Sequence, residues 1–503
     1  MAGCRVLLLS AYELGHQSFS IASAWAQLEH AGHDVEALDA SLDPPAPAAF
    51  DRVELLAISV PMHTALRLGI ELAKLASERR PTAHVCLFGL YAWMHAEELL
   101  ATVADSVIGG EFEASLVEIA ARLAAGRPLF GIAGVSLPGA PPVPPRLERV
   151  DLLTPRRDRL PPLERYAKLE RAEGQTSLAG YVEASRGCKH RCRHCPIVPV
   201  YDGRFFLVPR EVVLADVEQQ VEQGARHVTF GDADFFNGPR HGLEILRAVH
   251  AAHPELTFDV TTKVEHILRY RDHLPELREL GCLFVVSALE SLSDRVLEEL
   301  DKGHTRADIF SALELVRAAG IGLRPSFVPF TPWTTLDDYV MLVDFVVEQR
   351  LIGSVDPIQL AIRLLVPRGS ALLWPRAGER RPAGSAALER PAVDAPGWVG
   401  PYDHEALGHR WRHADQRMER LYADVSREVE LGAGAAGDPS AVIGQIRALA
   451  YAAAGRPAPP PPPRATEFVP RLTESWFCCA EPSREQMARL GACEKENTCR
   501  RCD

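Results

Sequence analysis

The segment Glu183-Ala-Ser-Arg-Gly-Cys-Lys-His-Arg-Cys-Arg-His-Cys-Pro196 decides how the rest of the chain is organised. Its cysteines, Cys188, Cys192 and Cys195, have the spacing C-x3-C-x2-C, which favours a [4Fe–4S] cluster. Three thiolates bind three of the four irons, so one iron keeps an open position for a small chelating ligand that can accept an electron. Zinc is the alternative, but it usually takes four nitrogen or sulfur ligands in paired spacings, and no second pair follows nearby.

The same spacing resembles the signature of the radical S-adenosylmethionine (radical SAM) superfamily. The resemblance implies that the amino and carboxylate groups of SAM chelate the open iron. It also implies that reduction breaks a sulfur–carbon bond of SAM and produces a carbon radical. An electron donor such as flavodoxin or ferredoxin is then expected as a partner.

Apolar strands alternate with helices on both sides of the cysteine segment. Strands are expected at 181–185, 227–231, 257–262, 283–289, 322–330 and 357–365. Six such units predict a partial (β/α)6 barrel over residues 181–375, with the chemistry at the carboxyl ends of its strands.

Polar residues follow these apolar strands. Asp232 and Asp234 can accept hydrogen bonds from an ammonium group, and Glu290 can accept them from ribose hydroxyls. One of the two aspartates is equally well explained as the cap of the next helix. Resemblance to radical SAM enzymes gives a cofactor-binding set of His194, Gly231, Asp232, Asp234, Lys263, Glu290 and Ser291. In that comparison His194 packs on the adenine, whereas Lys263 is either a ligand of the SAM carboxylate or an ordinary solvated lysine.

The first 125 residues show the same alternation, with strands expected at 5–10, 34–39, 55–60, 84–89 and 106–110. This pattern predicts a doubly wound, Rossmann-like parallel sheet, whose ligand lies beyond the carboxyl ends of the strands. No G-x-G-x-x-G follows the first strand, so a dinucleotide is not indicated. Three turns resemble the cobalamin-binding domain that precedes many radical SAM domains: Gly15-His-Gln17, Phe88-Gly-Leu-Tyr-Ala92 and Gly109-Gly-Glu-Phe-Glu113. Because D-x-H-x-x-G is missing, either cobalamin binds without a lower histidine ligand or the domain has kept the fold without the ligand.

Composition changes mark the remaining boundaries. Residues 126–180 are rich in proline and arginine and predict an extended linker, and residues 376–456 are mostly helix formers. Residues 457–503 comprise a polyproline spacer and a cysteine-rich tail, which either folds back over the barrel or hangs free. His404, His409 and His413 complete no recognised metal pattern and are interpreted as surface histidines, although a helix would place His409 and His413 on one face.

The tail concentrates thiols: Cys478, Cys479, Cys493, Cys499 and Cys502. Adjacent cysteines rarely pair with each other, but they present two soft ligands to one soft centre. Three interpretations remain open, namely an auxiliary iron–sulfur cluster, a structural zinc, or a substrate site for a thiophilic element such as trivalent arsenic.

The tail sequence Cys478-Cys479-Ala-Glu-Pro482, with the first domain and the cysteine segment, resembles the CUAEP/CCAEP-tail radical SAM family. That family is similar to the radical SAM enzyme of arsinothricin biosynthesis. The resemblance implies transfer of the 3-amino-3-carboxypropyl group of SAM to arsenite, with Cys478 and Cys479 as catalytic residues that hold the arsenic. The alternatives are a cobalamin-dependent radical SAM methyltransferase with an auxiliary metal site in the tail, and a metal- or redox-sensing protein.

Composition excludes several other classes. The chain has 503 residues and a net charge of -12, which suggests several domains and argues against a nucleic-acid partner. No apolar run reaches transmembrane length, so no membrane partner is expected. Eight of the 11 cysteines fall in two clusters, which favours metal or thiolate chemistry in a reducing, cytoplasmic compartment.

Overall fold

The first domain is built on a six-stranded sheet with the order β2-β1-β3-β4-β5-β6. A computed structural model describes residues 3–172, 174–374, 397–434, 439–463, 468–474 and 481–490. The strands are β1 (Arg5–Ser10), β2 (Asp34–Asp39), β3 (Leu55–Ser59), β4 (His84–Phe88), β5 (Ser106–Ile108) and β6 (Val135–Ser136). The first five are parallel, as the sequence predicts, and β6 pairs antiparallel with β5.

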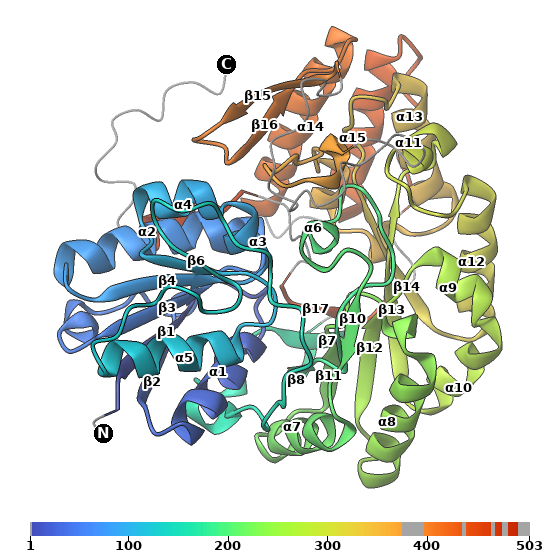
Figure 1. Cartoon of the computed structure of the whole chain (residues 1–503). Helices are drawn as coiled ribbons and strands as arrows, with labels where there is room; N and C mark the ends of the chain where they lie inside the picture. The colour runs from blue at the N-terminus through green and yellow to red at the C-terminus, as the bar shows by residue number, and fades with distance from the viewer. Residues whose placement is uncertain are drawn as a thin grey trace.

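Helices cover both faces of this sheet (Figure 1). They are α1 (Phe19–His30), α2 (His63–Arg79), α3 (Leu90–Met94), α4 (Ala96–Thr102) and α5 (Glu113–Ala124). Apolar side chains from α1 and α5 form one core, and those from α2, α3 and α4 form another on the opposite face. The central strand β3 is buried along its whole length, which is why it is a continuous apolar run. The predicted doubly wound fold is therefore confirmed.

The segment predicted as a linker packs on both domains. It contains β6, the 3-10 turns η2 (Arg157–Arg159) and η3 (Leu163–Arg165), and β7 (Lys168–Ala172), and it enters β8 (Gln175–Val182). Arg157 is fully buried and forms an ion pair with Asp216, with 2.8 Å between Nε and Oδ1. The same guanidinium donates to the carbonyl of Gln17 in the first domain and to that of Tyr181 in β8. The side chain of Arg157 thus ties the two domains together.

The second domain has a seven-stranded sheet with the order β14-β13-β12-β11-β8-β7-β17. Its parallel strands are β8, β11 (His227–Phe230), β12 (Thr257–Thr261), β13 (Cys282–Glu290) and β14 (Gly322–Phe327). The curved sheet is enclosed by α7 (Arg210–Glu222), α8 (Pro239–Ala252), α9 (Val264–Arg269), α10 (Leu274–Glu279), α11 (Asp294–Glu299), α12 (Arg306–Ala318) and α13 (Leu336–Glu348). This arrangement confirms the predicted partial barrel.

Two barrel strands differ from the prediction. The first, β8, begins earlier and ends at Val182, and a short hairpin of β9 (Ser185–Gly187) and β10 (Phe205–Leu207) then carries the cysteine segment. The predicted strand at 357–365 is wrong, since that stretch contains the 3-10 turn η7 (Pro357–Leu360) and one parallel bridge between Phe330 and Arg363. Pro357 lacks the amide hydrogen that a sheet ladder requires, which explains the short pairing.

The region after the barrel is not helical throughout. An antiparallel hairpin of β15 (Val399–Asp403) and β16 (Gly408–Trp411) precedes α14 (Gln416–Gly434) and α15 (Pro439–Ala453). His409 lies in β16, so His409 and His413 do not share a helix face. Among the described residues, none of His404, His409 and His413 belongs to a potential metal-binding group.

The described part of the tail folds back onto the rest of the chain. Strand β17 (Arg471–Leu472) pairs with β7 at the edge of the barrel sheet. The described segment 481–490 contains α16 (Arg484–Arg489). Met487 and Leu490 pack against the core of the first domain. Within the described ranges, no helix is long and apolar enough to span a membrane.

Candidate active site

A cavity of about 370 Å³ lies where the carboxyl ends of both sheets face each other. The first domain contributes the turns after β1 and β3 and the start of α3, represented by Leu14, Met62 and Tyr91. The barrel contributes the cysteine segment and the ends of β11, β12, β13 and β14. The lining is mostly apolar, with a few converging polar groups, as is usual for small-molecule sites.

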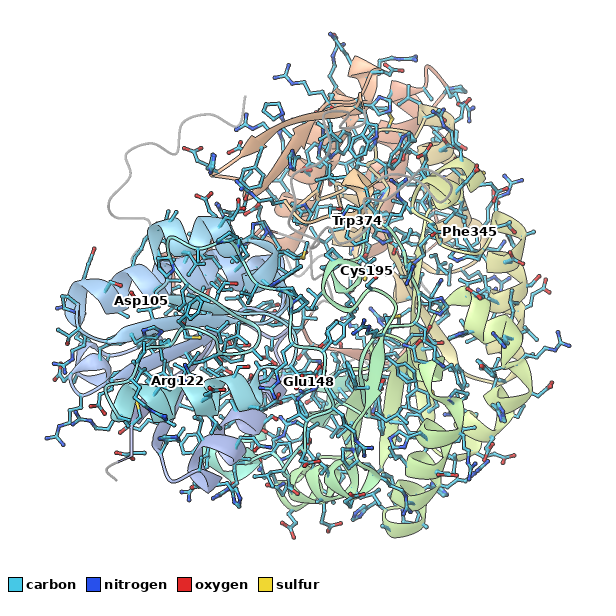
Figure 2. The ribbon with its side chains drawn as sticks, viewed as in Figure 1. Asp105, Arg122, Glu148, Cys195, Phe345 and Trp374 are labelled. Carbon is cyan, nitrogen blue, oxygen red and sulfur yellow. The ribbon has the colours of Figure 1, made fainter. Side chains whose placement is uncertain are left out.

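All three cysteines of the C-x3-C-x2-C segment line this cavity. Cys188 and Cys192 are buried and Cys195 is partly buried. Cys195 lies at the junction between the two domains (Figure 2). The Asn237 amide approaches the Cys188 sulfur, with 3.5 Å between Nδ2 and Sγ. Three sulfur atoms without a disulfide at one end of a cavity are the donors that an iron–sulfur cluster requires, so these residues fit the group.

The thiols need a compensating charge to ionise. Burial raises the pKa of Cys188 and Cys195, so in isolation they stay protonated. Lys302 is buried in the same cavity wall and interacts electrostatically with Cys192 and Cys195. Iron, when bound, would take the place of the thiol protons, and the ammonium of Lys302 would partly offset the charge of the thiolates.

Glu290 connects the cysteine segment to the end of β13. Its Oε1 lies 3.0 Å from His194 Nε2 and accepts a hydrogen bond from Lys302 Nζ at 3.2 Å. Burial opposes ionisation of Glu290, but Lys302 and His194 outweigh it and lower its pKa to about 2. Its backbone has a φ of 63°, a left-handed conformation that turns the carboxylate into the cavity. The sequence predicted Glu290 and His194 but missed Lys302, which no local pattern distinguishes from a surface lysine.

The end of β11 holds the predicted Gly231, Asp232 and Asp234. Gly231 lines the cavity, and a Cβ there would lie 1.9 Å from the Tyr181 hydroxyl oxygen, so a larger residue would require the Tyr181 side chain to move. Asp232 also lines the cavity and accepts hydrogen bonds from the Ala184 amide and the Ser185 hydroxyl. Burial raises the pKa of Asp232 to about 6.

Asp234 is fully buried and is not among the residues that line the cavity. Its Oδ1 accepts a hydrogen bond from the amide of Phe236 at 3.2 Å, so it caps the 3-10 turn η4 (Phe235–Asn237). This is the capping role that sequence analysis offered for one of the two aspartates. Contact with the SAM ammonium would require the carboxylate to leave these partners, and it stays a prediction.

Lys263 and Ser291 occupy different environments. Lys263 is buried in the cavity wall, with its Nζ 3.1 Å from His190 Nδ1, so it is not a solvated lysine. Ser291 is buried, and its hydroxyl accepts a hydrogen bond from the amide of Ser293. A role for either residue in cofactor binding remains a prediction.

Comparisons with known proteins agree with this geometry. The family description "Radical SAM superfamily" matches residues 182–346, which contain the cysteine segment and the barrel strands β11 to β14. Because of this match, residues 182–346 are called the radical SAM domain below. The domain implies a [4Fe–4S] cluster and SAM as cofactors and confirms the prediction of an enzyme.

Curated relatives match the chain in part. An uncharacterized methyltransferase of Pyrococcus horikoshii is 25% identical over 248 residues, which cover 48% of this chain and 52% of that protein. The tRNA-2-methylthio-N(6)-dimethylallyladenosine synthase of Haemophilus influenzae is 29% identical over 206 residues, which cover 37% of this chain and 42% of that protein. The chain thus spans about half the length of these relatives or less.

Solved structures extend the similarity beyond the radical SAM domain. OxsB, a cobalamin-dependent SAM radical enzyme solved with aqua-cobalamin and SAM, has a TM-score of 0.67 at 15% identity and covers 86% of this chain and 67% of its own. TsrM from Kitasatospora setae is a radical SAM methyltransferase solved with tryptophan and a SAM analogue. Its structure has a TM-score of 0.55 at 20% identity, and the match covers 68% of this chain and 70% of TsrM. At these identities the likeness concerns the fold.

A buried ion network joins the first domain to the radical SAM domain. Arg186 in β9 lies 2.9 Å from Glu111 Oε2 and 2.7 Å from Glu113 Oε1, measured from its NH1 and NH2 nitrogens. Its Nε also contacts Glu183 at 3.1 Å. Tyr201 donates a further hydrogen bond to Glu111. The end of β5, predicted as part of a ligand site, is therefore occupied by the strand that carries the cysteines.

Replacing Arg186 by methionine should destabilise the protein by roughly 3–5 kcal/mol, because buried carboxylates lose their partner. The measurement is urea unfolding of the cluster-free protein, so that loss of iron does not contribute. Arg5→Met removes the exposed pair with Glu54 and should cost less than about 1 kcal/mol. Equal losses in the two variants would contradict the role of the network.

The described flanks of the tail segment 475–480 contact the first domain beside the cavity. Glu474 lines the cavity and accepts a hydrogen bond from the Tyr12 hydroxyl at 2.5 Å. Glu481, from the Cys-Cys-Ala-Glu-Pro sequence, lies 2.9 Å from Nε2 of the buried His63 and 3.2 Å from Nε of Arg67. His63 directly follows Met62 in the cavity wall. Cys478, Cys479, Cys493, Cys499 and Cys502 lie outside the described residues.

Proposed function

We propose that the protein is a radical SAM transferase that moves a carbon group of SAM onto a substrate at the interface between its two domains. The best candidate is transfer of the 3-amino-3-carboxypropyl group to arsenite held by tail thiols. The observation that carries the proposal is the cavity itself, where three cluster cysteines, the polar ends of the barrel strands and the flank of the tail converge.

In this proposal, the residues of the radical SAM domain bind the cluster and SAM and orient SAM toward the substrate. Cys188, Cys192 and Cys195 would hold the cluster, which supplies one electron to SAM when bound. Glu290, kept anionic by Lys302 and His194, would accept hydrogen bonds from the ribose hydroxyls. The apolar wall from the first domain excludes water, which protects a carbon radical from unwanted partners.

The proposed reaction balances with two electrons from a flavodoxin- or ferredoxin-type donor. The first breaks the Cγ–S bond of SAM, and 5′-methylthioadenosine leaves. The 3-amino-3-carboxypropyl radical then forms a carbon–arsenic bond and displaces one sulfur from arsenic. The second electron returns that sulfur to the thiolate.

Two described residues support a role for Cys478 and Cys479 in holding arsenite. Glu474 precedes the segment 475–480 and lines the cavity, and Glu481 follows it and pairs with His63 beside the same wall. The chain therefore enters and leaves this segment near the cavity. Soft thiolates prefer a soft element with a lone pair, which suits trivalent arsenic.

A cobalamin-dependent methyltransferase is the second candidate, favoured by the fold of the first domain and its likeness to OxsB and TsrM. The apolar strand ends facing the cavity suit a corrin, and the buried His16 lies among them, its pKa lowered to about 4 by burial. However, a Cβ on Gly109 would lie 2.2 Å from Trp93, and one on Gly110, at φ 79°, would lie 2.1 Å from the carbonyl oxygen of Arg146. These glycines serve packing within the protein and give no independent support for cobalamin.

Identification of the SAM fragment separates the two candidates. The reconstituted protein is incubated anaerobically with SAM and a reductant, with and without arsenite, and the products are identified by mass spectrometry. Release of 5′-methylthioadenosine that increases with arsenite is the expected result. 5′-Deoxyadenosine or S-adenosylhomocysteine formed only with added cobalamin would instead favour the methyltransferase and contradict aminocarboxypropyl transfer.

A further inference from the structure

Three potential metal ligands converge beside the cysteine segment. His190 comes from the loop between Cys188 and Cys192, Asp234 follows β11, and His266 lies in α9. His190 Nε2 is 3.2 Å from Asp234 Oδ2, and His266 Nδ1 is 2.9 Å from the same oxygen. All three ligand atoms lie within 4.8 Å of one another.

These three atoms are buried and lack proper hydrogen bonds. Within the described part of the chain, His190 Nε2, Asp234 Oδ2 and His266 Nδ1 are enclosed polar atoms without a partner of acceptable hydrogen-bond geometry. Asp234 is fully buried, and its other oxygen, Oδ1, is satisfied by Phe236 and Thr262. Leaving a buried polar atom unpaired is costly, so three at one point indicate a missing common partner.

The distances match those around a transition-metal ion. With metal–ligand distances of about 2.1 Å, neighbouring ligand atoms are about 3.0 Å apart at right angles and about 3.4 Å apart at tetrahedral angles. The two contacts of Asp234 Oδ2, at 3.2 and 2.9 Å, correspond to this range. Two imidazoles and one carboxylate form a donor set that suits iron, manganese, cobalt or zinc and leaves open positions.

The neighbouring charges are compatible with this ligation. A metal on His190 Nε2 places the ring proton on Nδ1, which lies 3.1 Å from Lys263 Nζ. Lys263 would then turn to Glu265, whose Oε2 is 3.5 Å from Nζ and 3.6 Å from His190 Nδ1. Glu265 can accept from both groups, as an outer carboxylate often does beside a metal-bound histidine.

We propose that His190, Asp234 and His266 bind one divalent first-row transition-metal ion, separate from the iron–sulfur cluster. The ion links the loop between two cluster cysteines to the end of β11 and to α9. It therefore fixes the cysteine segment on the barrel, independently of which group is transferred.

Mn²⁺ is the appropriate probe because the tail thiols and the cluster cysteines are poor ligands for it. Cluster-loaded full-length protein is titrated with MnCl₂, and free Mn²⁺ is followed by electron paramagnetic resonance. One ion should bind per chain. Asp234→Asn and His266→Gln should each weaken binding by at least about 10–100-fold, the usual loss when even an outer partner is removed.

The matched control is His227→Gln. His227 is a buried histidine in the same barrel whose Nε2 lies 2.8 Å from Asp259 Oδ1, and among the described residues this pair belongs to no group of three potential metal ligands. This variant should bind Mn²⁺ like the wild type. Iron content and visible absorbance of the cluster report whether each variant has folded.

A measurement on the wild type covers the case in which the variants fail to fold. Electron spin-echo modulation of bound Mn²⁺ should show nitrogen couplings from two imidazoles. Mn²⁺ that does not bind, that binds without these couplings, or that binds unchanged in folded Asp234→Asn protein would overturn the proposal. In that case the three residues form a hydrogen-bonded cluster only.

Discussion

Replacing Cys188 by alanine is expected to abolish cleavage of SAM. With only two thiolates left from the C-x3-C-x2-C segment, the cavity no longer provides the three ligands that hold a cluster with one open iron. Iron and sulfide per chain, the visible absorbance of the anaerobic reconstituted protein, and SAM fragments in the same preparation measure the effect. Cys192→Ala and Cys195→Ala should behave identically, with SAM fragments at the level of a reaction without enzyme.

Cys282→Ala is the matched control for this loss. Cys282 is a buried thiol in β13 of the same barrel, packed in the apolar core and not among the residues that line the cavity. The variant should retain its cluster and its SAM cleavage, apart from a small loss of stability for the missing sulfur. A Cys188→Ala protein that still cleaves SAM at more than a trace rate would contradict the assignment of the cluster ligands.

The sequence predicted those parts of the fold that depend on local apolar runs. Most of the parallel strands follow such runs, and the cysteine spacing alone identified three residues that line the cavity. The prediction of a sixth barrel strand is wrong because Pro357 and its neighbours form a 3-10 turn. Strand β17 has two residues, Arg471–Leu472, and pairs only because the chain returns to the barrel edge, so no periodicity could show it.

Site residues were missed where their partners are distant in sequence. Lys302 becomes part of the cavity because α11 and the turn after it return the chain to Glu290. Arg186 meets Glu111 and Glu113 from a different domain, about 75 residues earlier, so the sequence pattern after β5 predicts a ligand site where the structure has an ion network. His190 and His266 carry no motif in common, and they converge on Asp234 only in the folded barrel. Contacts of this kind follow from topology, which single-sequence patterns do not specify.

The proposed role of the tail leads to the strongest prediction about substrate, because in that proposal the radical SAM domain forms the radical and the tail thiols hold its target. Cys478→Ser or Cys479→Ser should weaken arsenite binding more than about 100-fold, since a hydroxyl is a poor ligand for a soft element and loss of even an outer partner costs 10–100-fold. Arsenite binding is measured by equilibrium dialysis with arsenic quantified by mass spectrometry. Carbon–arsenic product should fall to background in the same variants.

The iron–sulfur cluster of the C-x3-C-x2-C segment provides the internal control for these tail variants. Cys188, Cys192 and Cys195 line the cavity from the radical SAM domain. The visible absorbance and iron content of the cluster that they bind should therefore be unchanged in Cys479→Ser protein. Cys86→Ala, which removes a fully buried thiol from β4 of the first domain, should leave both arsenite binding and the cluster intact. Wild-type arsenite affinity in both tail variants would eliminate arsenite transfer and leave methyl transfer as the function to test. Lost arsenite binding with retained SAM cleavage would instead separate the two roles, with the barrel supplying the radical and the tail supplying the acceptor.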